Sequence, residues 1–413
     1  MNALTSKQVL RPRAGGPRKW AEQKIINALP YFFSLLRCVK PVWNVAGVTL
    51  TSRYDHVREV FATDSKFGVM YKPKLDIIMG GEPFFLGTDD LLQHQYDTEA
   101  ICKVILPGDL PRLAADVEFR AEHIIKTSKG QIEVVNDLTR QVSFDFLATY
   151  LGISPPSNGD LRVWATRLFE FQFADGGNDK ALRAEVDEIA PALRAHIDAI
   201  IALRKQNTAS DDVLSRCLAL QSSGEPGFSD VQIRTALMGL IVGGPPQPPM
   251  VLPQAMEQLL RRPQILAEAQ AAARDNDDEK LRRYVLEAMR FDPLGPGLWR
   301  VALEDFTLAR GTPHEITIKA GSHVLAAFAS AMMDPRRVSN PKTFNPNRPA
   351  SDYMHFGYGL HECFGRYINL ATLHLMLKPL LKQPGLRRAP RGYGKLSKNG
   401  PFAERLVIQY DHN

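Results

Sequence analysis

The sequence predicts a mainly α-helical fold with small β-sheets, built as a single domain. Amphipathic periodicity dominates the middle of the chain, at residues 110–127, 137–151, 160–173 and 180–205. Short alternating stretches occur near residue 42 and between residues 299 and 328. Apolar residues that recur every three or four positions indicate helices, whereas alternation indicates strands. A chain of 413 residues could hold two or three average domains, but helical proteins of this size often fold as one unit.

Composition indicates an ordinary globular protein, with 44% hydrophobic and 23% charged residues. The cysteines are scattered without a C-x-x-C pair, which argues against a disulfide framework or a zinc site and favours a cytoplasmic location. The net charge of +6 comes with no dense basic block, so no nucleic-acid partner is expected. Every apolar run falls short of the roughly 20 residues that a membrane span needs, so no membrane association is expected. The cysteines are Cys38, Cys102, Cys217 and Cys363.

The N-terminal third begins with an expected flexible arm, residues 1–20, where Pro and Gly lie among basic residues. Residues 21–413 are expected to form the single domain. Alternation at residues 42–45 and 48–51 predicts a hairpin that turns at Ala46-Gly47, and residues 54–62 read as a short helix. Residues 66–90 read as an irregular loop. Its length suggests a functional loop, and Phe84 and Phe85 are adjacent within it.

Helices are expected next at residues 93–105, which include His94, and at the four amphipathic stretches. Asp137 is expected to cap the helix that it begins. Phe169, Phe171 and Phe173 are spaced by two, so they cannot all lie on one face of a regular helix. Some of them are therefore expected to face a cavity, and the others the core.

A long central helix is expected at residues 230–262, with an interruption. Four prolines fall within the five residues 245–249. They remove backbone donors and clash with preceding carbonyls, so a regular helix cannot pass through. Helical periodicity resumes at Val251.

The C-terminal third contains a helix at residues 281–291, capped by Asp277 or Asp278, in which Glu287 and Arg290 lie on one face. Strands are expected at residues 299–303, 306–309, 315–318 and 322–328. A glycine-rich loop at residues 355–366 then carries Cys363, and a helix follows. Glycines let the backbone approach a flat ligand closely, and the N-terminus of a helix stabilises a thiolate.

This loop reads His-Phe-Gly-Tyr-Gly-Leu-His-Glu-Cys-Phe-Gly-Arg and resembles the heme-ligand loop of the cytochrome P-450 family, Phe-Gly-x-Gly-x-His-x-Cys-x-Gly. The resemblance implies a cytochrome P-450 fold that binds heme b between the central helix and the helix after the cysteine. Cys363 would be the iron ligand and His361 would reach a heme propionate. Phe356, Gly357 and Gly365 would contact the cofactor.

The same resemblance assigns further roles. His94 and Arg300 would bind heme propionates, although Thr98 stands where the family has an arginine. Glu287, Arg290 and Arg348 resemble the family's Glu–Arg–Arg triad, which locks the scaffold beneath the heme. The loop positions and glycines near the expected heme edge suggest a pocket for a bulky, largely apolar small molecule. The pocket residues proposed on this basis are Phe84, Phe85, Gly243, Gly244, Leu294 and Gly295.

The central helix departs from the family at the positions that deliver protons during oxygen activation. There the family has an acid and an alcohol, and this chain has Pro246 and Gln247, neither of which can carry a proton. Three functions remain open. The chain could be a monooxygenase that uses water ordered by Gln247, with a ferredoxin or flavodoxin as redox partner. It could use peroxide or rearrange a hydroperoxide. It could also be a heme-binding sensor or carrier.

Overall fold

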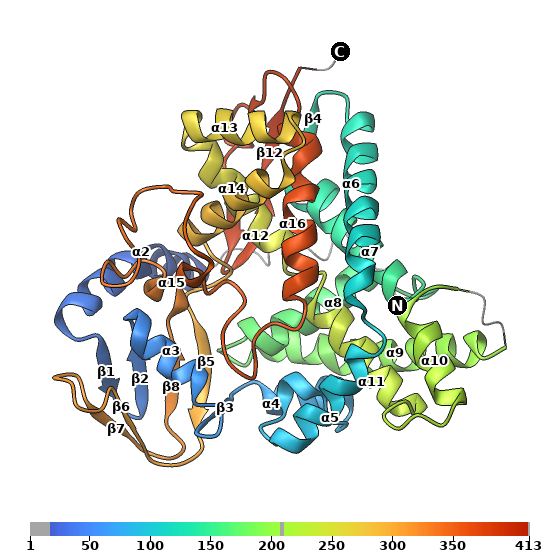
Figure 1. Ribbon diagram of the computed structural model, residues 1–413, viewed down its shortest axis with the longest axis horizontal. Coiled ribbons are helices and arrows are strands. Elements are labelled where there is room, and N and C mark those ends of the chain that lie inside the picture. Colours follow the sequence, from blue (N-terminus) through green and yellow to red (C-terminus); the bar gives the residue numbers. More distant parts are fainter. Residues whose placement is uncertain (1–16, 207–209, 412–413) are drawn as a thin grey trace.

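A computed structural model describes residues 17–206 and 210–411. A five-stranded sheet with strand order β1-β2-β8-β5-β3 lies at one end of the molecule, and α2, α3 and α15 lie beside it (Figure 1). β2 and β8 pair in parallel, whereas the other neighbours are antiparallel. The elements of this region are α2 (Pro17–Val39), β1 (Val42–Val45), β2 (Val48–Thr51), α3 (Tyr54–Ala62), β3 (Phe67–Val69), β5 (Leu298–Ala302), β8 (His323–Ala326) and α15 (Phe328–Ala331).

The larger region is helical. Figure 1 shows α6 and α16 side by side, and these two helices pack against each other along their length. Its helices are α4 (Lys72–Met79), α5 (Leu91–Cys102), α6 (Leu110–Thr127), α7 (Gln141–Leu151), α8 (Leu161–Phe169), α9 (Lys180–Arg204), α10 (Val213–Ser222), α11 (Asp230–Gly243), α12 (Pro248–Leu260), α13 (Pro263–Arg274), α14 (Asp278–Phe291) and α16 (Arg366–Leu381).

Three smaller sheets complete the described part of the chain. The one made of β4, β12 and β9 joins the last strand to the segment before η3, a π-helix at Val134–Arg140. The other two are the antiparallel hairpins β6–β7 and β10–β11. Their strands are β4 (Gln131–Glu133), β6 (Phe306–Leu308), β7 (Ile316–Ile318), β9 (Arg387–Arg388), β10 (Ser397–Asn399), β11 (Phe402–Arg405) and β12 (Val407–Gln409).

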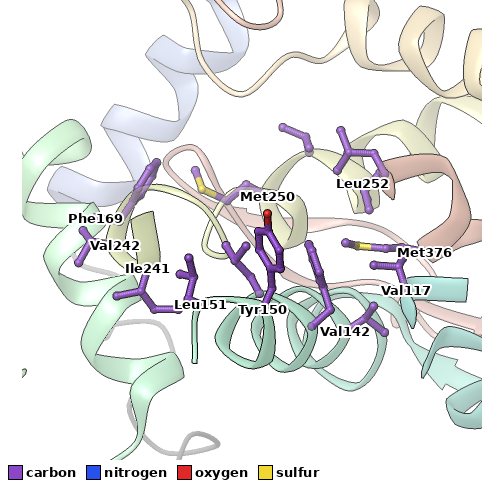
Figure 2. Close-up of a cluster of buried hydrophobic side chains, with 14 of the residues drawn as sticks. Val117, Val142, Tyr150, Leu151, Phe169, Ile241, Val242, Met250, Leu252 and Met376 are labelled. Carbon is purple, nitrogen blue, oxygen red and sulfur yellow. The ribbon is translucent and has the colours of Figure 1, made fainter. Parts of the chain in front are cut away.

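One large apolar core holds the helices together. Val117 of α6, Val142 of α7, Ile241 of α11, Leu252 of α12 and Met376 of α16 are all fully buried in it (Figure 2). Removing this apolar surface from water is the main force that stabilises the arrangement. Helices from distant parts of the sequence are thereby fixed around one interior.

The predicted hairpin is confirmed, with its turn at Ala46-Gly47, where φ is 50° and 79°. The helix at residues 54–62 and the break in the central helix are also confirmed. The helix resumes at Pro248, however, three residues before the predicted Val251. Pro248 and Pro249 occupy its first turn, where the missing N–H groups have no intrahelical acceptor.

Other expectations are corrected. Asp137 lies inside the π-helix η3, and the carboxylate of Glu133 caps that helix by accepting from the N–H groups of Val135 and Asn136. Residues 66–90 contain β3 and α4 instead of an irregular loop. Most of the expected arm lies outside the described residues, and residues 17–20 form the first turn of α2.

None of the helices in the described part of the chain combines the length and apolar character that crossing a bilayer requires.

Candidate active site

A cavity of about 1340 Å³ lies in the interior where the α11–α12 break, the loop between α14 and β5, and the glycine-rich cysteine loop meet. Its wall is largely apolar. Side chains on the wall include Phe84, Leu240, Val251, Leu294, Phe356, Cys363 and Ile368. A cavity of this size is large enough for a flat cofactor together with a second molecule, since ligand pockets usually measure about 300–1,000 Å³.

The cysteine loop reaches the cavity through a set of tight backbone turns. The Cys363 N–H donates to the Phe356 carbonyl at 2.8 Å. Gly357 and Gly359 have φ of 76° and 80°, which side chains adopt only with strain. Gly365 has φ of −75° and precedes α16, and a Cβ there would lie 3.8 Å from the Cys363 sulfur. Positive φ thus explains two of the three glycines, whereas the third leaves space beside the sulfur.

The surroundings of Cys363 favour the protonated thiol over the thiolate as long as no cation binds the sulfur. Burial raises the pKa of the Cys363 thiol to about 11, and the Gly365 backbone N–H opposes this shift. The expected stabilisation by the start of α16 is therefore weaker than the effect of burial. A metal ion bound to the sulfur reverses this balance, because a coordinating thiol is deprotonated.

Buried polar groups without hydrogen-bond partners gather at one side of the cavity. Arg300 is 2% exposed, and its Nε has no partner within residues 17–206 and 210–411. Both ring nitrogens of buried His361 and Nε2 of His94 also lack a hydrogen-bond partner there, although Asp89 Oδ1 lies 3.7 Å from His361 Nε2. The ring centroids of His94 and His361 lie 5.6 Å apart. Arg300 and His361 lie on the cavity wall, whereas His94 lies behind it. Buried unpaired donors are costly, so they indicate an anionic ligand.

Glu287, Arg290 and Arg348 are brought together below the cysteine loop. Arg290 donates to the two carboxylate oxygens of Glu287 at 2.9 and 2.7 Å, and Arg348 Nε donates to Glu287 Oε1 at 3.1 Å. The Tyr353 hydroxyl and the Asn345 N–H also donate to this carboxylate. All of its acceptor positions are therefore satisfied away from water.

The α11–α12 break forms part of the cavity wall. The side-chain amide of Gln247 donates to the Gly243 carbonyl, and Ser143 Oγ donates to the Pro245 carbonyl at 2.8 Å. These two side chains satisfy carbonyls that the missing helical turn leaves free. Gln247 lies on the wall, but Pro246 is buried outside it, which corrects the expectation that both face the reaction site.

Of the predicted pocket residues, Phe84, Gly243, Gly244, Leu294 and Gly295 line the cavity. Phe85 does not. Its ring packs on His94 and Phe364, with centroids 5.7 and 5.3 Å apart, so it belongs to the layer behind the wall.

Phe169, Phe171 and Phe173 all border the cavity, although the sequence predicted a division between cavity and core. The helix widens to a π-helix, η4, at Glu170–Ala174. Phe169 and Phe173 are four residues apart and so share a face even in a regular helix, and their ring centroids lie 4.9 Å apart. Phe171 is two positions from each, and the spacing did not predict that it also borders the cavity.

The sequence pattern also missed charged residues on the wall, among them Asp292 and Lys398. Asp292 directly follows α14 and Lys398 lies on the short strand β10, so neither stands in a recognisable motif. Only the fold brings them together.

A family model described as cytochrome P-450 matches residues 177–386. The chain belongs to the cytochrome P-450 family. Members of this family are heme-thiolate iron proteins, so its cofactor is heme b. The match spans the broken central helix, the Glu–Arg–Arg residues and the cysteine loop.

Curated relatives include larger proteins. A bifunctional dioxygenase–epoxy alcohol synthase of Pyricularia oryzae is 24% identical over 395 residues, which cover 85% of this chain and 34% of that protein. Psi-producing oxygenase A of Emericella nidulans is 37% identical over 140 residues, 33% of this chain and 13% of the relative. The chain thus spans about a third or less of these proteins. Cyclomarin C epoxidase of Salinispora arenicola is 27% identical over 282 residues, 67% of this chain and 65% of that protein.

Solved structures show the same fold. P-450BioI, in complex with an acyl carrier protein ligated to hexadec-9Z-enoic acid, has a TM-score of 0.80 at 18% identity, covering 95% of this chain and 100% of that one. Substrate-free CYP109E1 from Bacillus megaterium has a TM-score of 0.77 at 20% identity, with coverage of 94% and 100%. The predicted mainly α fold of the cytochrome P-450 type is therefore confirmed.

The residues of the cavity fit heme. A partly buried cysteine, glycines beside its sulfur and cationic or imidazole donors without hydrogen-bond partners at one side match the iron, the flat macrocycle and the carboxylates of that cofactor. Thiolate ligation supplies electron density to the iron and favours O–O bond cleavage.

Proposed function

We propose that this cytochrome P-450 chain is an oxygenase that acts as a monooxygenase on a bulky, largely apolar small molecule. The observation that carries the proposal is the cavity itself, whose apolar wall continues to the Cys363 sulfur. An apolar substrate loses unfavourable contact with water on entering such a cavity. Reaction close to the iron follows from the position of the sulfur on the same wall.

In this proposal Cys363 is the axial ligand. Arg300 and His361 bind the carboxylates of the cofactor, and His94 supports His361 from behind through their edge-to-face contact. Phe356, Gly357 and Gly365 frame the sulfur side of the macrocycle. Glu287, Arg290 and Arg348 keep this scaffold fixed, because a buried, fully hydrogen-bonded ionic network has only one satisfied arrangement.

A second candidate function uses a peroxide or hydroperoxide in place of dioxygen. The α11–α12 break favours this candidate. A route that reduces dioxygen needs protons at the oxygen, whereas a peroxide or hydroperoxide already contains the O–O bond. One of the two Gln247 amide N–H groups donates to the Gly243 carbonyl, and no acid or alcohol occupies residues 243–249. Relatives named as epoxy alcohol synthases also agree with a hydroperoxide-rearranging activity.

If dioxygen is the oxidant, electrons come from a separate acidic protein such as a ferredoxin or flavodoxin. Arg366 and Lys103 are candidate basic residues for its docking face. Both are already paired, Arg366 with Glu362 at 2.8 Å and Lys103 with Glu225. An acidic partner must compete with these neighbouring carboxylates. Its electrostatic attraction to Arg366 and Lys103 is therefore weaker than it would be if both side chains were unpaired.

Turnover of one apolar probe, dodecan-1-ol, under two oxidants tests both candidates. One reaction contains NADPH, a ferredoxin and its reductase, and the other contains hydrogen peroxide or cumene hydroperoxide alone. Oxygenated product in the first supports a dioxygen monooxygenase, and product only in the second supports the peroxide route. Heme-loaded protein that gives no product from this or other apolar probes under either condition contradicts the proposed activity and favours a sensor or carrier.

A further inference from the structure

An ion pair interrupts the apolar wall of the cavity. Lys398 of β10 donates to Asp292 Oδ1 at 3.0 Å and to the side-chain carbonyl of Gln254, and the side chains of Lys398 and Asp292 are only 20% and 28% exposed. Gln254 of α12 is fully buried. Three elements from distant parts of the chain therefore converge on one polar point, and Asp292 and Lys398 both line the cavity.

Such a pair is costly in an apolar wall unless its remaining hydrogen-bonding capacity is used. Moving two charges out of water carries a desolvation penalty that only close contacts offset. An ammonium group has three N–H donors, and Lys398 uses two of them. Asp292 Oδ2 has no recorded hydrogen bond among the residues that the structure describes. One donor and one acceptor thus remain side by side at the cavity.

We infer that Lys398 and Asp292 form a subsite that binds a neutral polar group on the substrate, a carboxamide or a hydroxyl. Such a group accepts a hydrogen bond from Lys398 and donates one to Asp292. A free carboxylate satisfies Lys398 but is repelled by Asp292, and an ester can accept but cannot donate. The inference rests on the proposed function, since it specifies the polar end of the apolar substrate proposed above.

Binding of four probes with one C12 acyl or alkyl chain tests this subsite: dodecanamide, dodecan-1-ol, methyl dodecanoate and dodecanoate. Calorimetric titration into heme-loaded protein measures affinity without turnover. Dodecanamide and dodecan-1-ol should bind about tenfold or more tightly than methyl dodecanoate, because each donates a hydrogen bond to the Asp292 carboxylate that the ester cannot make. Failure of oxygenation would leave this ranking unaffected, so the two proposals can fail separately.

The variant Asp292→Asn provides the decisive comparison. It keeps size and can still accept from Lys398, but it replaces the free acceptor with an N–H donor. The advantage of dodecanamide over methyl dodecanoate should fall below twofold, and dodecanoate should bind more tightly than in the wild type. The matched control is Asp305→Asn, which breaks the exposed Lys319–Asp305 pair and should leave the ranking unchanged.

Lys398→Met, checked for heme content and circular dichroism, gives an independent measurement. It removes the Lys398 N–H donor and should lower the affinity for dodecan-1-ol and for methyl dodecanoate to a similar extent. A purely structural ion pair would lower the melting temperature of Asp292→Asn without altering the order of the four probes. That outcome overturns the inference. It is also overturned if wild-type protein binds all four probes with equal affinity or binds none of them.

Discussion

Arg290 donates two hydrogen bonds to Glu287, from Nε at 2.9 Å and from Nη2 at 2.7 Å, and neither side chain is exposed. This bidentate pair lies three residues apart on α14. Because water cannot reach either group, their hydrogen bonds come from protein partners only: Glu287 also accepts from Arg348, and Arg290 also donates to the Met332 carbonyl. The pair therefore ties α14 to the segment 332–353 that precedes the cysteine loop.

We expect Glu287→Gln to lower the free energy of unfolding by about 3–5 kcal/mol and to reduce heme incorporation, because it leaves buried Arg290 without a counter-charge and Arg348 with only Asp352, 3.7 Å away. Chemical denaturation and the ratio of heme to protein absorbance measure both effects. Asp76→Asn is a suitable control, since it breaks the exposed Lys72–Asp76 pair and should change stability by less than about 1 kcal/mol. A stable, fully heme-loaded Glu287→Gln protein with slower turnover would contradict a structural role.

Cys363→Ala should lose the spectrum of thiolate ligation. Wild-type protein, reduced and treated with carbon monoxide, is expected to absorb at the red-shifted Soret position typical of an iron–thiolate bond. The variant should lack this band even where it retains heme, because its side chain has no ligand atom. Cys102→Ser, at an exposed cysteine, should keep the band. Retention of the band in Cys363→Ala would show that another residue is the ligand.

Gln247→Ala should lower the free energy of unfolding by about 1 kcal/mol, since the Gly243 carbonyl loses its side-chain donor. If a peroxide is the native oxidant, NADPH consumption with redox partners should barely change. If dioxygen is reduced through a water near Gln247, the variant should consume more NADPH and release hydrogen peroxide.

Gln383→Ala is the matched control for this experiment, because Gln383 also donates from its amide to a carbonyl four residues earlier, that of Pro379, but lies away from the cavity. A Gln247→Ala protein with raised KM and unchanged coupling would instead indicate direct substrate binding. Unchanged stability, coupling, peroxide use and affinity together would mean that the break has no role in oxygen chemistry.

Stability should fall as the pH is lowered from about 6.5 to 4, partly through His374. Burial lowers the pKa of the His374 imidazole to about 4, with nearby Arg282 and Lys378 acting in the same direction and Asp278 opposing. The unfolded chain therefore binds more protons in this window, and stability rises with pH across it. The shift corresponds to at most about 3 kcal/mol.

His374→Phe should flatten this part of the stability curve, measured by denaturant titration at a series of pH values. His123→Phe, at an exposed position on α6, should leave the curve unchanged. A wild-type curve with the same slope as His374→Phe between pH 4 and 6.5 would show that this histidine does not titrate differently on folding.

Residues close in sequence determined much of this protein. The turn at Ala46-Gly47, the proline-rich interruption after Gly243 and the glycine-framed loop of Cys363 were all predicted from local patterns. Each depends on backbone restrictions of Gly and Pro that act within a few residues. For the same reason, spacing indicated that Glu287 and Arg290 share a helix face.

Tertiary structure alone decided which side chains meet at the cavity. Phe84 lines the wall whereas its neighbour Phe85 packs behind it, and Phe169, Phe171 and Phe173 all border the same cavity despite their spacing of two. Lys398 and Asp292 lie 106 positions apart and pair only because β10 packs beside the end of α14. Such contacts depend on how whole elements pack, and periodicity reports only which face of an element is apolar.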